Sequence, residues 1–177
     1  MKTRIQNIHT TAGETIRHFL GDTESILFFD IETTGLSPKN ASIYLIGVAF
    51  LQDKKWTLQQ WFAENTAEEE AILDAFLKFA APYRKLVHFN GTTFDVPFVQ
   101  AKCKKYGLDS PFPQMEQTDI YRQISPLKNL LKLPNCKQKT LEEYLGLNRE
   151  DPFTGGQLIE RYKVYRQERD HRLLEVL

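Results

Sequence analysis

The sequence predicts an α/β domain in which helices cover a mixed β-sheet. Short apolar runs closed by turn residues at 25–32, 43–51 and 86–89 indicate strands, and apolar residues recur with helical spacing at 72–80. These elements follow one another as strand, hairpin, helix, strand and helix, an order typical of α/β proteins. The 177 residues, 41% of them hydrophobic, are enough for one domain with a buried core, which we place over residues 1–177.

The first elements are a strand and a β-hairpin. Residues 25–32 (SILFFDIE) form an apolar run that the sequence TTG closes, as expected for a buried strand that ends in a turn. The apolar run 43–51 and the segment 56–62 are joined by the polar sequence QDKK. We therefore predict that these two segments pair as a hairpin.

A helix follows the hairpin. Thr66, with Glu69 three residues later, predicts a capping box, and Pro82 ends the helical pattern. Acidic side chains in the first turn of a helix interact favourably with its dipole. We therefore assign the acidic residues at 64–74 a structural role and no function.

The second half of the chain predicts further helices around one short strand. Residues 86–89 form the strand, and a helix begins near Thr92 or Thr93 and ends before Gly107, a C-cap residue. Two later helices are expected at 139–145 and 157–169.

Composition excludes several classes of protein. The chain has 23 basic and 23 acidic residues, a balance that argues against a polycation that coats nucleic acid without specificity. Its two cysteines, Cys103 and Cys136, fit neither a disulfide framework nor a zinc ribbon. The longest apolar run is about half the ~20 residues that a membrane span requires, and no export signal is present. We expect a soluble cytoplasmic protein without a membrane partner.

Asp30 and Glu32 form the first candidate site. Residues two apart on a strand point to the same side, so the two carboxylates would face one way while Ile31 packs on the other. Adjacent carboxylates repel each other, and hard oxygen ligands of this kind suit Mg²⁺ or Mn²⁺. The alternative is that both residues merely end a strand, with Asp30 capping the turn that follows.

Asp95 is the third candidate carboxylate. It falls on the first turn of the helix that follows the strand 86–89. Ligands bind at the carboxyl ends of strands in parallel sheets, and this placement would bring Asp95 towards Asp30 and Glu32. The alternative is a favourable interaction with the helix dipole alone.

Two segments resemble a known family. Residues 29–36 (FDIETTGL) and 89–98 (FNGTTFDVPF) closely resemble the first two motifs of the DEDD exonucleases, which belong to the ribonuclease H-like superfamily and include proofreading 3′→5′ exonucleases. The chain looks most like the bacterial branch described as predicted ribonuclease H-like exonucleases. The resemblance implies a ribonuclease H-like fold, a mixed five-stranded sheet flanked by helices.

The resemblance also implies site residues, cofactors and partners. Asp30 would bridge two Mg²⁺ or Mn²⁺ ions, Glu32 would ligate one of them, and Asp95 would complete part of the shell. The implied reaction is hydrolysis of phosphodiester bonds at the 3′ ends of DNA or RNA, most naturally single-stranded. The residues implied beside the terminal nucleotide, or in positioning the second motif, are Thr33, Thr34, Gly35, Leu36 and Asn90.

The family's fourth carboxylate is an Asp preceded by a His or Tyr that helps to deprotonate water. Four residues separate Tyr165 from Asp170, one more than in the usual tyrosine-type motif. Residues 173–177 end the chain within an apolar helical pattern, so we expect a C-terminal truncation before this motif. Such a chain should bind metal weakly and cleave slowly. In the alternative, Asp170 fills the role.

Other residues receive lesser roles. We expect Asp119 to be structural or at most to support the site, and His88 to be a half-buried strand residue. Seven lysines could contact phosphates or simply form a solvated surface: Lys102, Lys104, Lys105, Lys128, Lys132, Lys137 and Lys139. Two alternative functions are a non-catalytic nucleic-acid-binding module with an incomplete acidic site and a ribonuclease H-type endonuclease.

Overall fold

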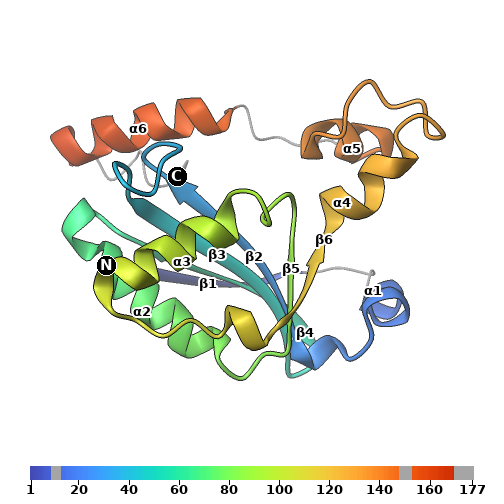
Figure 1. The fold of residues 1–177 in the computed structure, drawn as a ribbon, viewed down its shortest axis with the longest axis horizontal. Helices are drawn as coiled ribbons and strands as arrows, with labels where there is room; N and C mark the ends of the chain where they lie inside the picture. Colours follow the sequence, from blue (N-terminus) through green and yellow to red (C-terminus); the bar gives the residue numbers. More distant parts are fainter. Residues whose placement is uncertain (9–12, 148–152, 170–177) are drawn as a thin grey trace.

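The structure, a computed structural model, describes residues 1–8, 13–147 and 153–169. Within this part of the chain a mixed sheet has the strand order β1-β4-β3-β2-β5-β6, and helices flank it (Figure 1). The strands are β1 (Lys2–Ile8), β2 (Ile26–Thr33), β3 (Ile43–Gln52), β4 (Lys55–Phe62), β5 (Lys85–His88) and β6 (Glu116–Asp119). The helices are α1 (Gly13–Leu20), α2 (Glu69–Ala80), α3 (Asp95–Tyr106), α4 (Ile120–Ile124), α5 (Gln138–Tyr144) and α6 (Gly155–Glu168).

The sheet is mixed, as predicted, but it has six strands and not five. Strands β1, β4, β3 and β2 pair antiparallel, and β2, β5 and β6 pair parallel. Strand β1 was not predicted, because its residues KTRIQNI are mostly polar and all but one of them are exposed. This strand exists through its backbone pairing with β4, which leaves no apolar pattern in its own sequence.

The predicted hairpin is present. Strands β3 and β4 pair from Leu45↔Phe62 to Gln52↔Lys55. The turn residues Asp53 and Lys54 have φ values of 50° and 63°, the left-handed conformation that matches the twist of two paired strands.

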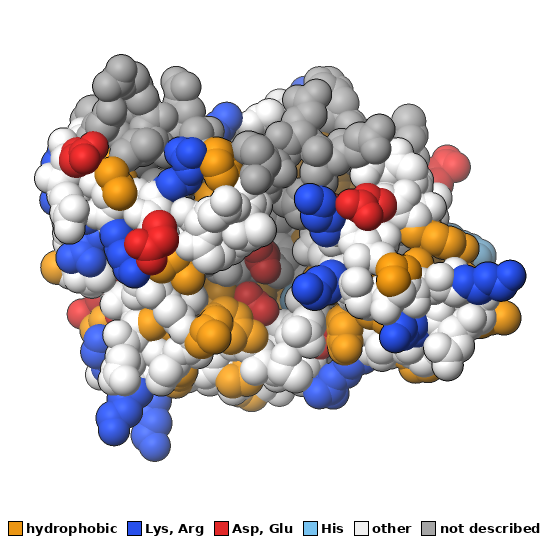
Figure 2. Space-filling model, turned by 90° about the horizontal axis from the view of Figure 1, so that it is seen from above, with side chains coloured by type: hydrophobic (Ala, Val, Ile, Leu, Met, Phe, Trp, Pro, Cys, Tyr) orange, Lys and Arg blue, Asp and Glu red, His pale blue; other side chains and the backbone are white. Residues whose placement is uncertain are grey.

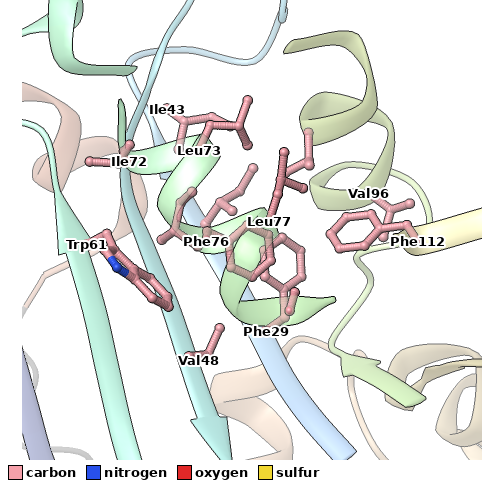
Figure 3. Packing of buried hydrophobic residues seen from close by; sticks show 14 of the residues in the cluster. Phe29, Ile43, Val48, Trp61, Ile72, Leu73, Phe76, Leu77, Val96 and Phe112 are labelled. Atoms are coloured by element: carbon pink, nitrogen blue, oxygen red, sulfur yellow. The ribbon is translucent and has the colours of Figure 1, made fainter. Parts of the chain in front are cut away.

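Helices α2 and α3 cover one face of the sheet and enclose the main core (Figures 1 and 3). Phe29 of β2 stacks on Phe76 of α2 with ring centroids 5.1 Å apart, and Ile31 is buried in the same cluster. Because side chains alternate along a strand, Asp30 and Glu32 point to the opposite face. The packing of β2 therefore determines which way the two carboxylates face.

Helix α6 packs near the end of β2 (Figure 1). Its Tyr162 and Tyr165 are fully buried against Tyr44 and Phe62 of the sheet. Tyr162 stacks on Tyr44 with ring centroids 4.0 Å apart. The pairing of β2 with β3 has a register shift between Glu32 and Thr33.

The predicted capping box at Thr66 is wrong. Helix α2 begins at Glu69, and the preceding turn is capped by Asn65, whose side chain accepts a hydrogen bond from the amide of Ala67. Glu69 is fully buried and forms an ion pair with Lys102 of α3, so it makes a tertiary contact and does not cap its own helix. Among the described residues no helix is both long and apolar enough to cross a membrane.

Candidate active site

Strand β2 presents Asp30 and Glu32 on the face turned away from the main core. Asp30 is exposed and Glu32 is half-buried, whereas Ile31 between them is 5% exposed. The residue directly opposite Asp30 on β3 is Gly47, which has no side chain. Two negative side chains thus share one face with open space next to them.

Asp95 reaches β2 from the first turn of α3. The parallel pairing of β2 with β5 ends at Phe28↔Val87, and beyond it the Ile31 amide donates to Oδ1 of Asp95 at 3.3 Å. The carboxylate therefore contacts the backbone between Asp30 and Glu32. Burial raises the pKa of Asp95 to about 6, although hydrogen bonds from its own amide and that of Ile31 work in the opposite direction.

Two adjoining cavities open along these carboxylates. One of about 610 Å³ is lined by Asp30, Glu32, Asp95 and Asn90, and residues 135–138 form another part of its wall. The second, of about 490 Å³, shares Asp30 and Glu32 and extends to Leu158 of α6. Figure 2 shows a hollow in this face with acidic side chains at its floor and basic side chains beside it.

The residues that the resemblance implies beside the terminal nucleotide do not all lie at the cavities. Asn90 lines the larger cavity, whereas none of the residues from Thr33 to Leu36 lines either one. Thr33 is buried, and its hydroxyl donates to the carbonyl of Gly35 at 2.8 Å. Leu36 is 84% exposed on the loop that joins β2 to β3.

Asp119 supports the segment that leads to Asp95, in agreement with the structural role expected for it. It caps α4 and accepts hydrogen bonds from the amide of Asn90 at 2.8 Å and the hydroxyl of Thr92 at 2.7 Å. Burial alone would raise the pKa of Asp119, but hydrogen bonds, that from Thr92 foremost, outweigh it and hold this pKa below its usual value. The ionised carboxylate of Asp119 thus holds the Asn90–Thr92 turn in place through these hydrogen bonds.

His88 is fully buried and not half-buried as expected. Its side chain is 0% exposed, and neither ring nitrogen has a hydrogen-bond partner within the described residues. Burial lowers the pKa of His88, and Asp119, 3.7 Å away, opposes this effect. A Cβ on Gly91 would lie 2.7 Å from the His88 ring, so the ring requires glycine at that position.

The candidate lysines divide into different environments. The prediction for Lys102 is wrong, because it is 2% exposed and its Nζ lies 3.1 Å from Oε1 of Glu69. Lys104 and Lys105 are exposed near the end of α3 and line neither carboxylate-containing cavity. Lys137 lines the larger cavity together with the carboxylates. Its neighbours there, Asn135 and Gln138, were not predicted, because they belong to no motif.

The three carboxylates meet part of what a divalent cation needs. Carboxylate oxygens are the ligands that Mg²⁺ and Mn²⁺ prefer, so Asp30, Glu32 and Asp95 suit such an ion chemically. Across 1–8, 13–147 and 153–169, however, no group of three or more His, Cys, Asp or Glu side chains is gathered closely enough to hold a metal. The carboxylates thus surround one cavity without completing a coordination sphere. Tyr165 is described and its hydroxyl donates to Glu64, whereas Asp170 and residues 173–177 lie outside the described residues.

Comparison with known proteins gives matches in sequence and in structure. Residues 27–177 match the RNase_H superfamily. The curated relatives include DNA polymerase III PolC-type of Caldanaerobacter subterraneus subsp. tengcongensis, 28% identical over 138 residues, and that of Ureaplasma parvum serovar 3, 25% identical over 141 residues. Each match covers 66% of this chain but only 9% and 10% of the respective relative, so the chain spans about a tenth of their length.

Solved structures agree with the sequence matches. The zinc-bound form of an E. coli ExoI–ssDNA complex has a TM-score of 0.55 and 13% identity, covering 85% of this chain and 42% of that one. An ExoI/SSB-Ct complex has the same TM-score and identity and covers 87% and 43%. At this identity the likeness establishes the fold, and the predicted ribonuclease H-like class is confirmed. Together with the sequence matches, it also supports the resemblance to DEDD-type exonucleases.

Proposed function

The chain belongs to the RNase_H superfamily, and from this premise we propose that it is a metal-dependent nuclease that hydrolyses phosphodiester bonds at nucleic-acid ends. One observation carries the proposal. Asp30 and Glu32 from β2 and Asp95 from α3 line the same cavity, and Asp95 accepts a hydrogen bond from the amide between the other two. If Asp30 and Glu32 merely ended a strand, nothing would require Asp95, a buried carboxylate from a distant helix, to lie at this point.

Asp30, Glu32 and Asp95 would hold Mg²⁺ or Mn²⁺, two ions in the proposed two-metal arrangement. Bound there, such ions supply an activated water and stabilise charge on the leaving oxygen. The contribution of the chain is to hold Asp30 and Glu32 on one face, where their mutual repulsion favours a cation between them. Asp95 joins them as an acceptor once it has lost its proton, which its pKa of about 6 allows at neutral pH.

The proposed substrate is a single-stranded 3′ end of DNA or RNA, degraded in the 3′→5′ direction. The resemblance of residues 29–36 and 89–98 to the exonuclease motifs supports this polarity, and the similar ExoI structure contains single-stranded DNA. A cavity of about 610 Å³ lies within the range of small-ligand sites and suits a terminal nucleotide. Lys137 on its wall would contact a phosphate.

Activity of this chain alone should be slow. The proposed site has three carboxylates, whereas the family's reaction uses a fourth Asp and a neighbouring base. The hydroxyl of Tyr165 is engaged by Glu64 at 2.9 Å, so in this arrangement it is not a base at the cavity. We therefore propose that three ligands give weak metal binding and a low turnover rate.

A second candidate is a nucleic-acid-binding module without catalysis. It is favoured by the finding that the described residues gather no group of three potential metal ligands. Binding of an oligonucleotide that neither needs Mn²⁺ nor leads to cleavage would support this candidate over the nuclease.

The test of the nuclease proposal is Mn²⁺-dependent shortening of end-labelled DNA and RNA strands. Loss of a 3′ label before a 5′ label would establish the direction, and resistance of circular strands would exclude an endonuclease. Asp30→Asn should abolish the activity, and Asp109→Asn, an exposed carboxylate outside both carboxylate-containing cavities, should retain it. Equal cleavage by both variants would assign the activity to a contaminant and refute the proposal.

A further inference from the structure

The smaller of the two cavities beside the carboxylates extends over strand β3. Its lining includes Asp30 and Glu32 of β2 and Gly47 from the middle of β3. Gly47 is also the residue directly opposite Asp30 in the pairing of these two strands. The position of β3 that lies across from the first carboxylate is therefore one without a side chain.

Glycine is an unfavourable residue in the interior of a strand. It loses more conformational entropy on folding than other residues do, and it offers no side chain to pack. A glycine in a strand usually has one of three reasons: a bulge, a positive φ, or the close approach of another backbone or of a ligand.

The fold does not require glycine at position 47. Its pairing is regular on both sides, with Asp30 of β2 and Gln60 of β4, and the register shift of β2 lies beyond this pair. Its φ is outside the left-handed region. Within the described residues, the nearest atom to a Cβ on Gly47 would be the carbonyl oxygen of Asp30 at 4.0 Å, an ordinary van der Waals contact. The strand would thus accept a side chain here, and the reason that remains is the close approach of a ligand.

The lining of the smaller cavity suits an uncharged group with apolar faces. Leu45 and Leu58 contribute apolar side chains, and the amides of Gln60 and Gln138 supply neutral hydrogen-bond donors and acceptors. None of the lining residues that the structure describes there is Lys or Arg, whereas Lys137 lines the larger cavity. A nucleoside matches this lining, because its base has apolar faces, edges that form hydrogen bonds, and no charge.

The two cavities adjoin in a way that one substrate can use. Asp30 and Glu32 line both of them. A phosphodiester placed at these carboxylates would have one nucleoside in the larger cavity, where the terminal nucleotide is proposed to bind. The nucleoside on the other side of the phosphodiester would then lie in the smaller cavity, over Gly47.

We propose that the smaller cavity is a binding subsite for the nucleoside that precedes the scissile phosphodiester, and that Gly47 keeps this subsite open. The inference rests on the proposed nuclease function and adds a second nucleoside to its binding site. A side chain at position 47 would extend into the space of that nucleoside, while the larger cavity and the carboxylates would stay in place.

The experiment compares Gly47→Leu with Thr3→Leu. The Thr3 variant is the matched control, because it adds the same side chain to an exposed position of β1 in the same sheet, and Thr3 lines neither cavity. Binding is measured in EDTA by displacement of a fluorescein-labelled single-stranded oligonucleotide. The two competitors are a nucleoside 5′-monophosphate, which needs the larger cavity alone, and a dinucleoside monophosphate, which needs both cavities.

Gly47→Leu should raise the Kd of the dinucleoside monophosphate about tenfold, because one base loses its place. The Kd of the mononucleotide should stay within about twofold of the wild-type value, and Thr3→Leu should change neither Kd by more than about twofold. Gly47→Ala should raise the Kd of the dinucleoside monophosphate by a smaller factor. The Tm of both Gly47 variants should equal or exceed that of the wild type, since glycine is unfavourable in a strand.

Several results would overturn the subsite. An unchanged Kd of the dinucleoside monophosphate in Gly47→Leu would show that no base uses this space. A rise in both Kd values together with a lower Tm would show that Gly47 serves the fold. A lower Mn²⁺ affinity in Gly47→Leu would assign the space to metal ions and not to a nucleoside. If Gly47→Leu does not fold, Ala49→Leu fills the same cavity from the same face of β3 and should raise the same Kd.

Failure of the subsite and failure of the nuclease function give different results. A wild-type protein that binds and cuts oligonucleotides, with unaltered binding of the dinucleoside monophosphate in Gly47→Leu, would refute the subsite and leave the nuclease function intact. A wild-type protein that neither binds nor cuts nucleic acid would refute the nuclease function and the subsite with it.

Discussion

Replacing Asp95 by Asn should make the metal-free protein more stable at neutral pH. Burial raises the pKa of Asp95 from 3.8 to about 6, so the folded state resists its ionisation. The difference of about two pH units, at 1.36 kcal/mol each, corresponds to ~3 kcal/mol. Asn keeps a side-chain oxygen for the amide of Ile31 and carries no charge, so the substitution should recover most of this free energy.

The sign of the pH dependence follows from proton binding. Between pH 4 and 6 the folded state binds more protons at Asp95 than the unfolded state does, so the stability of the wild type falls as the pH rises through this window. Below about pH 4 the carboxyl is protonated in both states, and wild type and Asp95→Asn should be equally stable. Above about pH 6 the variant should be more stable by up to ~3 kcal/mol.

The assay is urea unfolding in EDTA at several pH values. The fluorescence of the buried Trp56 and Trp61 reports the transition. Asp109→Asn, an exposed carboxylate, serves as the control and should follow the wild type at every pH. A stability difference between Asp95→Asn and wild type that stays constant from pH 4 to 7.5 would refute the reasoning, as would a less stable variant at pH 7.5.

Three further predictions concern the site and its surroundings. Asp30→Asn should lower Mn²⁺-dependent cleavage by roughly two orders of magnitude or more in an end-labelled strand assay, with little change in Tm because Asp30 is exposed; near-normal cleavage would contradict this. Gly91→Ala should cost about 1–3 kcal/mol in urea unfolding, because its Cβ would lie 2.7 Å from the His88 ring, and an unchanged midpoint would contradict it. Lys137→Glu should weaken oligonucleotide binding at low salt, measured by fluorescence anisotropy, and make the affinity less dependent on salt. Lys104→Glu should bind like the wild type. Equal losses of affinity in the two variants would show that Lys137 has no special role in the cavity.

Local patterns predicted the parts of the fold that local interactions determine. The alternation in residues 25–32 indicated which side chains of β2 face the core, and the QDKK turn indicated the hairpin. Strand β1 escaped prediction because it is held by backbone pairing with β4, which no property of its own sequence reveals. Strand alternation and the placement of Asp95 after a strand singled out Asp30, Glu32 and Asp95 as candidates, and the resemblance to a family added their implied roles. Neither could specify the hydrogen bond to Ile31 or the burial that raises the pKa of Asp95.

The misassigned residues share one physical cause. Glu69 fits the capping-box spacing, and Lys102 belongs to a run of basic residues that resembles a solvated surface. Each local interpretation ignores a partner 33 positions away, and only the packing of α2 against α3 brings the two charges within 3.1 Å. An isolated buried charge would be expelled or neutralised, so neither residue could be predicted as buried without the other.

The cost of burying Asp95 leads to a final prediction about metal addition. A free Mn²⁺ concentration one hundredfold above the Kd would stabilise the folded state by about 2.7 kcal/mol, close to the ~3 kcal/mol that ionised Asp95 costs the metal-free protein. At pH 7.5, wild type in saturating Mn²⁺ should therefore unfold near the urea midpoint of Asp95→Asn in EDTA, and Mn²⁺ should shift that variant much less. Because the ion requires the deprotonated carboxylate, the gain in wild type should shrink between pH 6 and 5. An equal Mn²⁺ shift in both proteins would show that Asp95 is not a ligand, even if cleavage depended on Asp30.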